Sequence, residues 1–215
     1  SEPNPKKYID NKIDTHADDE VPSIAIIPLK NKGKDDDVFY AYGISADLIK
    51  DCSRAGIIRV ESLDNIEKIE NWDKLKADDL ALKLSVRYIA TGTLWKMENI
   101  FQLTIELYDT KNSKVIWLDR WQEDWNNLSN IKSNLSDGLL KALSRNSKIV
   151  NISETRNPKA YEFYLRGKYT FLKRKSLEDT DMSRSLLNKA IDIDDNFLAA
   201  KIYLARTWLG LETNS

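Results

Sequence analysis

The sequence has a single cysteine and a single histidine, and these are the first candidates for catalytic residues. The 215 residues hold one cysteine, Cys52, and one histidine, His16. A thiol and an imidazole can form a nucleophile–base pair. His16, however, lies in the polar stretch 11–20, where we expect no fixed structure, and Cys52 has the spacing of a residue packed in a helix. We therefore expect neither a Cys–His pair nor a Ser–His–Asp triad.

Metal and phosphate sites lack most of their usual residues. A structural zinc ion takes four Cys or His ligands and a catalytic one about three, which Cys52 and His16 cannot supply. The run 35–37 is three aspartates that could attract a hard cation, but it lacks the spaced oxygens and distal Glu of a calcium loop, so we predict a solvated loop. The 7 glycines form neither GxxxxGK[ST] nor GxGxxG. We predict no cofactor and no metal, although an all-carboxylate site stays open.

The charge balance bears on possible partners. The chain has 33 Lys+Arg against 34 Asp+Glu, which gives no bulk attraction to a phosphate backbone, so we expect no direct nucleic-acid partner. No apolar run approaches the roughly 20 residues of a membrane span. The first residue is not Met. We expect a piece of a longer protein, attached to a membrane only through a segment outside it, and the oligomeric state stays open.

Hydrophobic periodicity predicts an α+β domain over 22–150, after a disordered leader at 1–21. Residues 101–107 alternate apolar with polar, as in a strand with one covered face. Leucines at 135, 139 and 143 recur at helical spacing. The order strand, helix, strand near the start predicts a parallel crossover, and the later strands an antiparallel meander. We predict a five-stranded mixed sheet (23–28, 57–60, 88–96, 101–107 and 115–121) with three helices (39–55, 78–84 and 128–143).

After the polar joint 151–157, the pattern becomes helical only. We predict helices over 158–173, 177–193 and 196–211, the first opening with proline. Residues 160–167 (AYEFYLRG) are echoed by 199–205 (AAKIYLA), close to the period of about 34 residues of a tetratricopeptide unit. Residues 158–215 would be one unit plus the first helix of the next. Because such an incomplete stack leaves a face uncovered, we expect further repeats beyond residue 215.

Five motifs follow one another along the first domain: SIAIIP at 23–28, FYAYGISADLI at 39–49, VRYIATGT at 86–93, and ELYD at 106–109 with VIW at 115–117. In this order they resemble the TolB amino-terminal-like (FlgO-like) domain, and the segment 160–167 resembles the opening of the tetratricopeptide array that commonly follows it. The resemblance covers about 22–211. It implies an accessory region that binds partners or senses, following a class III nucleotide cyclase, a winged-helix regulator or a kinase.

The first helix of each tetratricopeptide pair lines a concave groove, which gives the candidate site. There, aromatic rings beside cations would hold a peptide with an acidic group. The alternative is that Tyr161 and Tyr164 pack against the first domain as a fixed joint. More than a third of each ring exposed would indicate the groove, and deep burial the joint. The candidate residues are Tyr161, Tyr164, Lys168, Phe171, Ile202 and Arg206.

Other residues have structural explanations. We predict that Gly43 allows close approach near a helix start and that Asp47 complements the helix dipole. The tryptophans at 95, 117, 121 and 125 would either cap the sheet under the third helix or form an exposed surface; we favour the cap.

These observations predict a non-catalytic regulatory or protein-interaction region of a larger bacterial signalling protein, binding a protein or peptide partner. The alternative is an accessory part of a nucleotide cyclase whose catalytic domain lies upstream. A third possibility is a structural spacer.

Overall fold

The computed structural model describes residues 21–143 and 155–209. Residues 1–20 of the predicted leader, most of the joint at 151–157 and the last residues of the predicted array lie outside these ranges. His16 does so too, so its expected separation from Cys52 stays a prediction.

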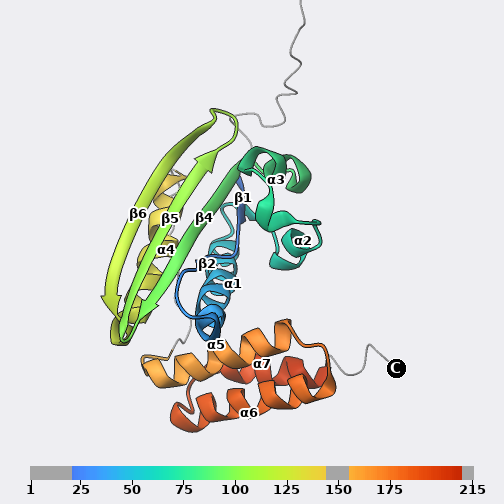
Figure 1. The fold of residues 1–215 in the computed structure, drawn as a ribbon, viewed down its shortest axis with the longest axis vertical. Coiled ribbons are helices and arrows are strands. Elements are labelled where there is room, and N and C mark those ends of the chain that lie inside the picture. The colour runs from blue at the N-terminus through green and yellow to red at the C-terminus, as the bar shows by residue number, and fades with distance from the viewer. Residues whose placement is uncertain (1–20, 144–154, 210–215) are drawn as a thin grey trace, which may run out of the picture.

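The described residues contain one six-stranded mixed sheet (Figure 1). Its order is β3-β1-β4-β5-β6, and β2 pairs with β4 beside β1. β1 lies parallel to β3 and β4, whereas β4, β5 and β6 run antiparallel. The predicted α+β class, parallel crossover and meander are thus confirmed. The strands are β1 (Ser23–Ile26), β2 (Lys30–Asn31), β3 (Arg59–Val60), β4 (Tyr88–Met97), β5 (Ile100–Asp109) and β6 (Lys114–Asp124).

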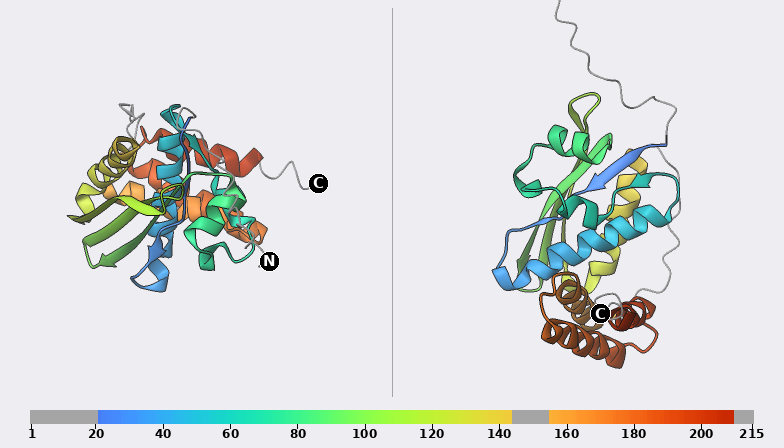
Figure 2. Two further views of the ribbon diagram at one scale, coloured as in Figure 1. Left: turned by 90° about the horizontal axis from the view of Figure 1, so that it is seen from above. Right: turned by 90° about the vertical axis from the view of Figure 1, so that its right-hand side faces the viewer.

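Helices cover both faces of the sheet unequally (Figures 1 and 2). The long helices α1 and α4 lie on one face, and the short α2 and α3 lie on the other, beside β1 and β4. The helices of this part are α1 (Val38–Arg54), α2 (Leu63–Glu67), α3 (Ala77–Leu84) and α4 (Leu128–Ala142), with 3₁₀ turns η1 (Asp35–Asp37), η2 (Trp72–Lys74) and η3 (Trp125–Asn127).

Two apolar clusters follow from this arrangement. The larger joins the sheet to α1 and α4 and includes Leu48, Leu103 and Leu139. The smaller lies under α2 and α3 and includes Leu80 and Ile89. β5 alternates buried and half-buried residues after its exposed first one, as its sequence pattern predicts. The uncovered parts of β4, β5 and β6 leave one sheet face open to solvent.

The structure adds one strand and one helix to the prediction. β2 is two polar residues, Lys30 and Asn31, held by pairing to Thr93 and Leu94. Neither has a strong strand preference, so the sequence carries no signal for it. The five-residue α2 is too short for helical periodicity. It begins where the Ser62 hydroxyl accepts a hydrogen bond from the Asn65 amide, 3.2 Å away.

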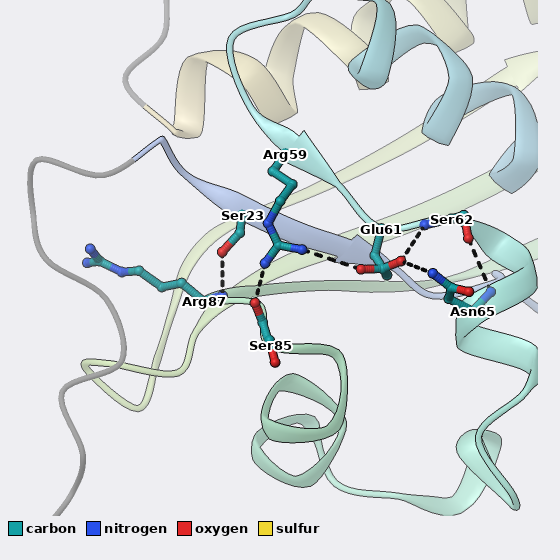
Figure 3. A network of polar contacts seen from close by, with 7 residues as sticks. All are labelled: Ser23, Arg59, Glu61, Ser62, Asn65, Ser85 and Arg87. Carbon is teal, nitrogen blue, oxygen red and sulfur yellow. Dashed lines mark hydrogen bonds and ion pairs between the residues drawn. The ribbon is translucent and has the colours of Figure 1, made fainter.

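A polar network fastens α2 and α3 to the edge of the sheet (Figure 3). Arg59 of β3 donates to the backbone carbonyl of Ser85, just after α3, and its guanidinium lies 3.4 Å from a Glu61 carboxylate oxygen. The same carboxylate accepts from the side chain of Asn65, at 2.7 Å. Ser23 of β1 accepts from the backbone amide of Arg87, at 3.0 Å. One edge arginine thus connects the ends of the segment that carries both short helices.

The remaining helices are α5 (Pro158–Leu172), α6 (Leu177–Ile193) and α7 (Leu198–Leu209). Of these, α5 packs against α1, and α6 and α7 follow as further helices of the same bundle (Figure 1). Pro158 is in the first turn of α5, as predicted, and Asn157 caps it. α6 begins with a capping box between Ser176 and Asp179. A Cβ on Gly167 would lie 2.8 Å from Cγ of Leu187, so this glycine allows α5 and α6 to approach closely.

Candidate functional site

Four of the six candidate groove residues are buried. The exposed fraction is 6% for Tyr161, 1% for Tyr164, 1% for Lys168 and 5% for Phe171. By the criterion above, the tyrosines form a fixed joint with the sheet-bearing part of the chain. The expectation that these four side chains line an open groove is therefore corrected. Tyr161, Tyr164 and Lys168 contact Asp47 of α1, and Phe171 belongs to the buried apolar cluster.

The carboxylate of Asp47 on α1 is the centre of this joint. It accepts hydrogen bonds from the hydroxyls of Tyr161, at 2.7 Å, and Tyr164, at 3.0 Å. The ammonium group of Lys168 lies 2.7 Å from the same carboxylate, and both side chains are almost fully buried, at 1% and 3% exposed. A buried carboxylate is strongly destabilising unless it is paired and hydrogen-bonded, and here three donors from α5 satisfy it. The joint thus has a fixed geometry.

Aromatic rings enclose the Lys168 ammonium group. It lies 5.7 Å from the ring centroid of Tyr164 and 5.3 Å from that of Tyr203 on α7, both within cation–π range. Burial raises the pKa of Tyr203 to about 12, mainly through loss of solvation of its phenolate. The ring therefore stays neutral beside the Asp47–Lys168 pair. Because Tyr203 comes from α7, the pocket of Lys168 draws on three helices.

Of the two roles predicted near the start of α1, close approach at Gly43 is confirmed and the dipole role of Asp47 is wrong. A Cβ on Gly43 would lie 2.7 Å from a methyl carbon of Leu165, so Gly43 does allow close approach, but of α5. Asp47 lies in the middle of α1 and pairs with Lys168, so the expected dipole role is wrong. An acidic residue one helical turn from buried Ile44 was the available signal, because an acid on an apolar stripe needs a partner.

The apolar cluster of the sheet continues through this joint without a break. The Trp125 ring lies 6.4 Å from that of Tyr161, which in turn lies 6.4 Å from that of Phe197, just before α7. At the rim, the Lys173 ammonium group contacts the Glu67 carboxylate at 2.5 Å. The sheet, α1 and the three C-terminal helices therefore share one core.

Ile202 and Arg206 are the two candidates that remain on the surface. Ile202 is 47% exposed, and Arg206 is exposed with its guanidinium 5.1 Å from the Tyr203 ring centroid. Other apolar side chains of α7 are also exposed, among them Leu198, Trp208 and Leu209. The structure does not bring these two candidates together with the other four on one accessible surface.

The buried environment of Cys52 does not favour a nucleophilic thiolate. Cys52 is fully buried. Burial raises the pKa of its thiol to about 12, and the negative charge of neighbouring Asp51 adds a smaller increase, so the thiolate is disfavoured.

No group of three His, Cys, Asp or Glu side chains in the described ranges could hold a metal ion. In the aspartate run, Asp37 lies 3.6 Å from the Lys96 ammonium group. None of the helices described is long and apolar enough to span a bilayer.

The tryptophans divide between the two predicted roles. The ring of Trp117 lies beneath α4, where a Cβ on Gly138 would come within 2.6 Å of it. The Trp121 ring lies 6.0 Å from it, and Trp125 packs on Phe101 at 4.6 Å. These three cap the core, as favoured. Trp95 is 43% exposed. It is on the open face.

No protein-family model and no curated protein matches the chain. Solved structures with similar folds include TolB from Acinetobacter baumannii, at 18% identity and a TM-score of 0.45, covering 59% of this chain and 29% of that one. PelC from Paraburkholderia phytofirmans has 18% identity and a TM-score of 0.42, covering 58% and 89%. A lipoprotein from Neisseria meningitidis has 17% identity and a TM-score of 0.42, covering 57% and 96%. These similarities concern fold, and none assigns a function.

Proposed function

We propose that the chain is a non-catalytic protein-interaction region of a larger bacterial signalling protein. In it, a TolB-like part at 22–150 holds the start of a tetratricopeptide array, 158–215, in a fixed orientation. The observation that carries the proposal is the joint at Asp47. Three buried donors of α5 contact one carboxylate of α1. A helical module that was independent and flexibly tethered would not need such a contact with the sheet-bearing part.

The fixed joint determines where a partner would bind. Because α1 covers one face of α5, the accessible candidate surface is the exposed side of α7, with Ile202 and Arg206. A protein or peptide with an apolar side chain beside a carboxylate complements it. An upstream nucleotide cyclase is one effector that such a region would serve, and the sequence resemblance supports it.

Site-specific photocrosslinking in cells tests this proposal. A photoreactive residue at position 202 is expected to capture a discrete protein, and Arg206→Glu should abolish the capture. The same residue at position 82, where Leu82 is 76% exposed on α3, is the matched control and should capture none. Equal labelling at both positions, or capture insensitive to Arg206→Glu, refutes binding at α7. Nucleotide turnover by the purified chain that one carboxylate substitution abolishes would refute the non-catalytic role.

A further inference from the structure

A groove lies on the open side of the sheet, away from the Asp47 joint. It has a volume of about 310 Å³, which is at the lower end for small-molecule sites. One wall comes from β4 and β5, and the other from the segment of η2 and the start of α3. This second wall belongs to the segment 61–85, and the Arg59 network of Figure 3 holds both ends of that segment at the sheet edge. The groove is therefore a built feature of the fold.

The two walls differ in chemistry. The helical wall is apolar and presents Trp72, Leu75 and Leu80. The strand wall is polar and presents the hydroxyls of Thr93 and Thr104, which face each other across β4 and β5. These two hydroxyls have no hydrogen-bond partner among the residues that the structure describes. A ligand with one apolar side and one polar side would match both walls.

Glu106 supplies a negative charge to the polar wall. Its side chain is half-buried, and Oε1 accepts a hydrogen bond from the Thr91 hydroxyl, 3.0 Å away. Within the described ranges, no Lys or Arg forms an ion pair with this carboxylate. Arg120 is the nearest cation in the strand register, opposite Thr104, and it does not pair with Glu106. A half-buried carboxylate with a free oxygen favours a cation as its partner.

The rim of the groove adds no net charge. Lys30 on β2 and Asp73 in η2 both line the groove and both are exposed. Their opposite charges are screened by solvent and offset each other at longer range. Glu106 is therefore the charged group that distinguishes one ligand class from another inside the groove.

We propose that this groove binds a small organic cation, an ammonium group on an apolar body. The ammonium group donates to Glu106 and to the neighbouring threonine hydroxyls. The apolar body lies against Leu75 and Leu80, and the Trp72 ring gives it a flat contact surface. This site is independent of the interaction role proposed for α7, since the two surfaces share no residue.

The probes are hexylammonium, hexanol and hexanoate, which share a body and differ in charge. In ¹H–¹⁵N NMR titrations of the whole chain, hexylammonium should shift the amides of Thr91, Thr93 and Thr104 saturably. Hexanoate should not, and hexanol should bind at least five-fold more weakly than hexylammonium. Saturable binding of hexanoate with equal affinity, or no saturable shift with hexylammonium, overturns the proposal.

Two variants and a matched control locate the site. Glu106→Gln keeps an acceptor for Thr91 and should weaken hexylammonium binding at least five-fold. Trp72→Ala should weaken hexylammonium and hexanol alike. Glu98→Gln, at an exposed turn residue between β4 and β5, should change nothing. An unchanged spectrum away from the groove shows that each variant is folded, and unaltered affinity in Glu106→Gln refutes the assignment whatever the photocrosslinking at position 202 shows.

Discussion

The ammonium group of Lys168 lies 2.7 Å from Oδ1 of Asp47, and the two residues come from helices on opposite sides of the joint. Neither charge reaches solvent. The Asp47 carboxylate depends on Lys168 and on the two tyrosine hydroxyls, and the Lys168 ammonium group depends on that carboxylate, with the backbone carbonyl of Gly43 3.5 Å away. The relative position of α1 and α5 is thus encoded in a polar contact inside an apolar cluster.

Removing one member of this pair should be strongly destabilising. Asp47→Ala removes the carboxylate that a buried ammonium group and two hydroxyls contact, and we expect a loss of about 3–5 kcal/mol in the free energy of unfolding. Urea denaturation, monitored by far-UV circular dichroism, measures this free energy. Lys201→Met breaks an exposed pair with Asp195 and, as the control, should change stability by less than about 1 kcal/mol.

A double variant tests whether the unpaired charge causes the loss of stability in Asp47→Ala. Asp47→Leu with Lys168→Met replaces the pair by apolar side chains of similar size, and we expect it to recover most of the stability that Asp47→Ala loses. A double variant as unstable as the single one would show that the cavity or the tyrosine hydroxyls, not the unpaired ammonium group, determine the loss.

Gly43→Ala tests the close approach of the two helices. The added methyl group would meet Leu165, which is fully buried and has little room to move, so we expect a loss of about 1–3 kcal/mol. Thermal unfolding monitors it. Gly92→Ala should be more damaging, because its Cβ would meet the backbone carbonyl of Thr104 in the neighbouring strand. The reverse order would contradict the packing described.

Stability should fall in acid partly through Asp109. Burial raises the pKa of its carboxyl, but hydrogen bonds from Arg87 and Asn112 and the Arg87 charge outweigh this and hold the pKa below its usual value. The unfolded chain therefore takes up this proton first, near pH 3.9. The stability from Asp109 is full above that pH and is lost as the pH falls through the folded-state pKa.

Asp109→Asn isolates this contribution. Urea denaturation at a series of pH values should give a shallower acid dependence than the wild type, and Asp192→Asn, at an exposed residue of α6, should leave the dependence unchanged. Identical slopes for Asp109→Asn and the wild type would rule out Asp109 as a source of acid sensitivity.

Cys52 should be inert in the folded protein. Because the thiol is buried and its pKa is raised, we expect no reaction with a charged disulfide reagent at pH 8 in the folded protein. After unfolding in urea, the reagent should react with one thiol per chain. Fast labelling under native conditions would show that α1 opens locally.

Sequence patterns predicted the regular elements with long repeats. The alternation of residues 101–107 predicts β5, and the leucines at 135 and 139 predict α4, because one buried face sets each repeat. No such pattern predicts β2, since its two residues pair only because β4 is beside them.

The joint between α1 and α5 shows how far the candidate site can be predicted from the sequence. The tetratricopeptide pattern predicts that Tyr161, Tyr164 and Lys168 share one face of α5, and they do lie together. The pattern leaves two possibilities for that face, an open groove or contact with the first domain, and spacing on α5 does not decide between them. That depends on Asp47, more than 100 positions earlier in the chain, and only the folded structure brings it there.

The unbroken apolar cluster from the sheet to α7 also links the evolution of the two parts. A helical segment exchanged by recombination would bring its own α5 face to an unchanged Asp47, and its donors would have to match. Asp47, Tyr161 and Lys168 should therefore be kept or replaced together among homologues, so that the parts are inherited as a matched pair.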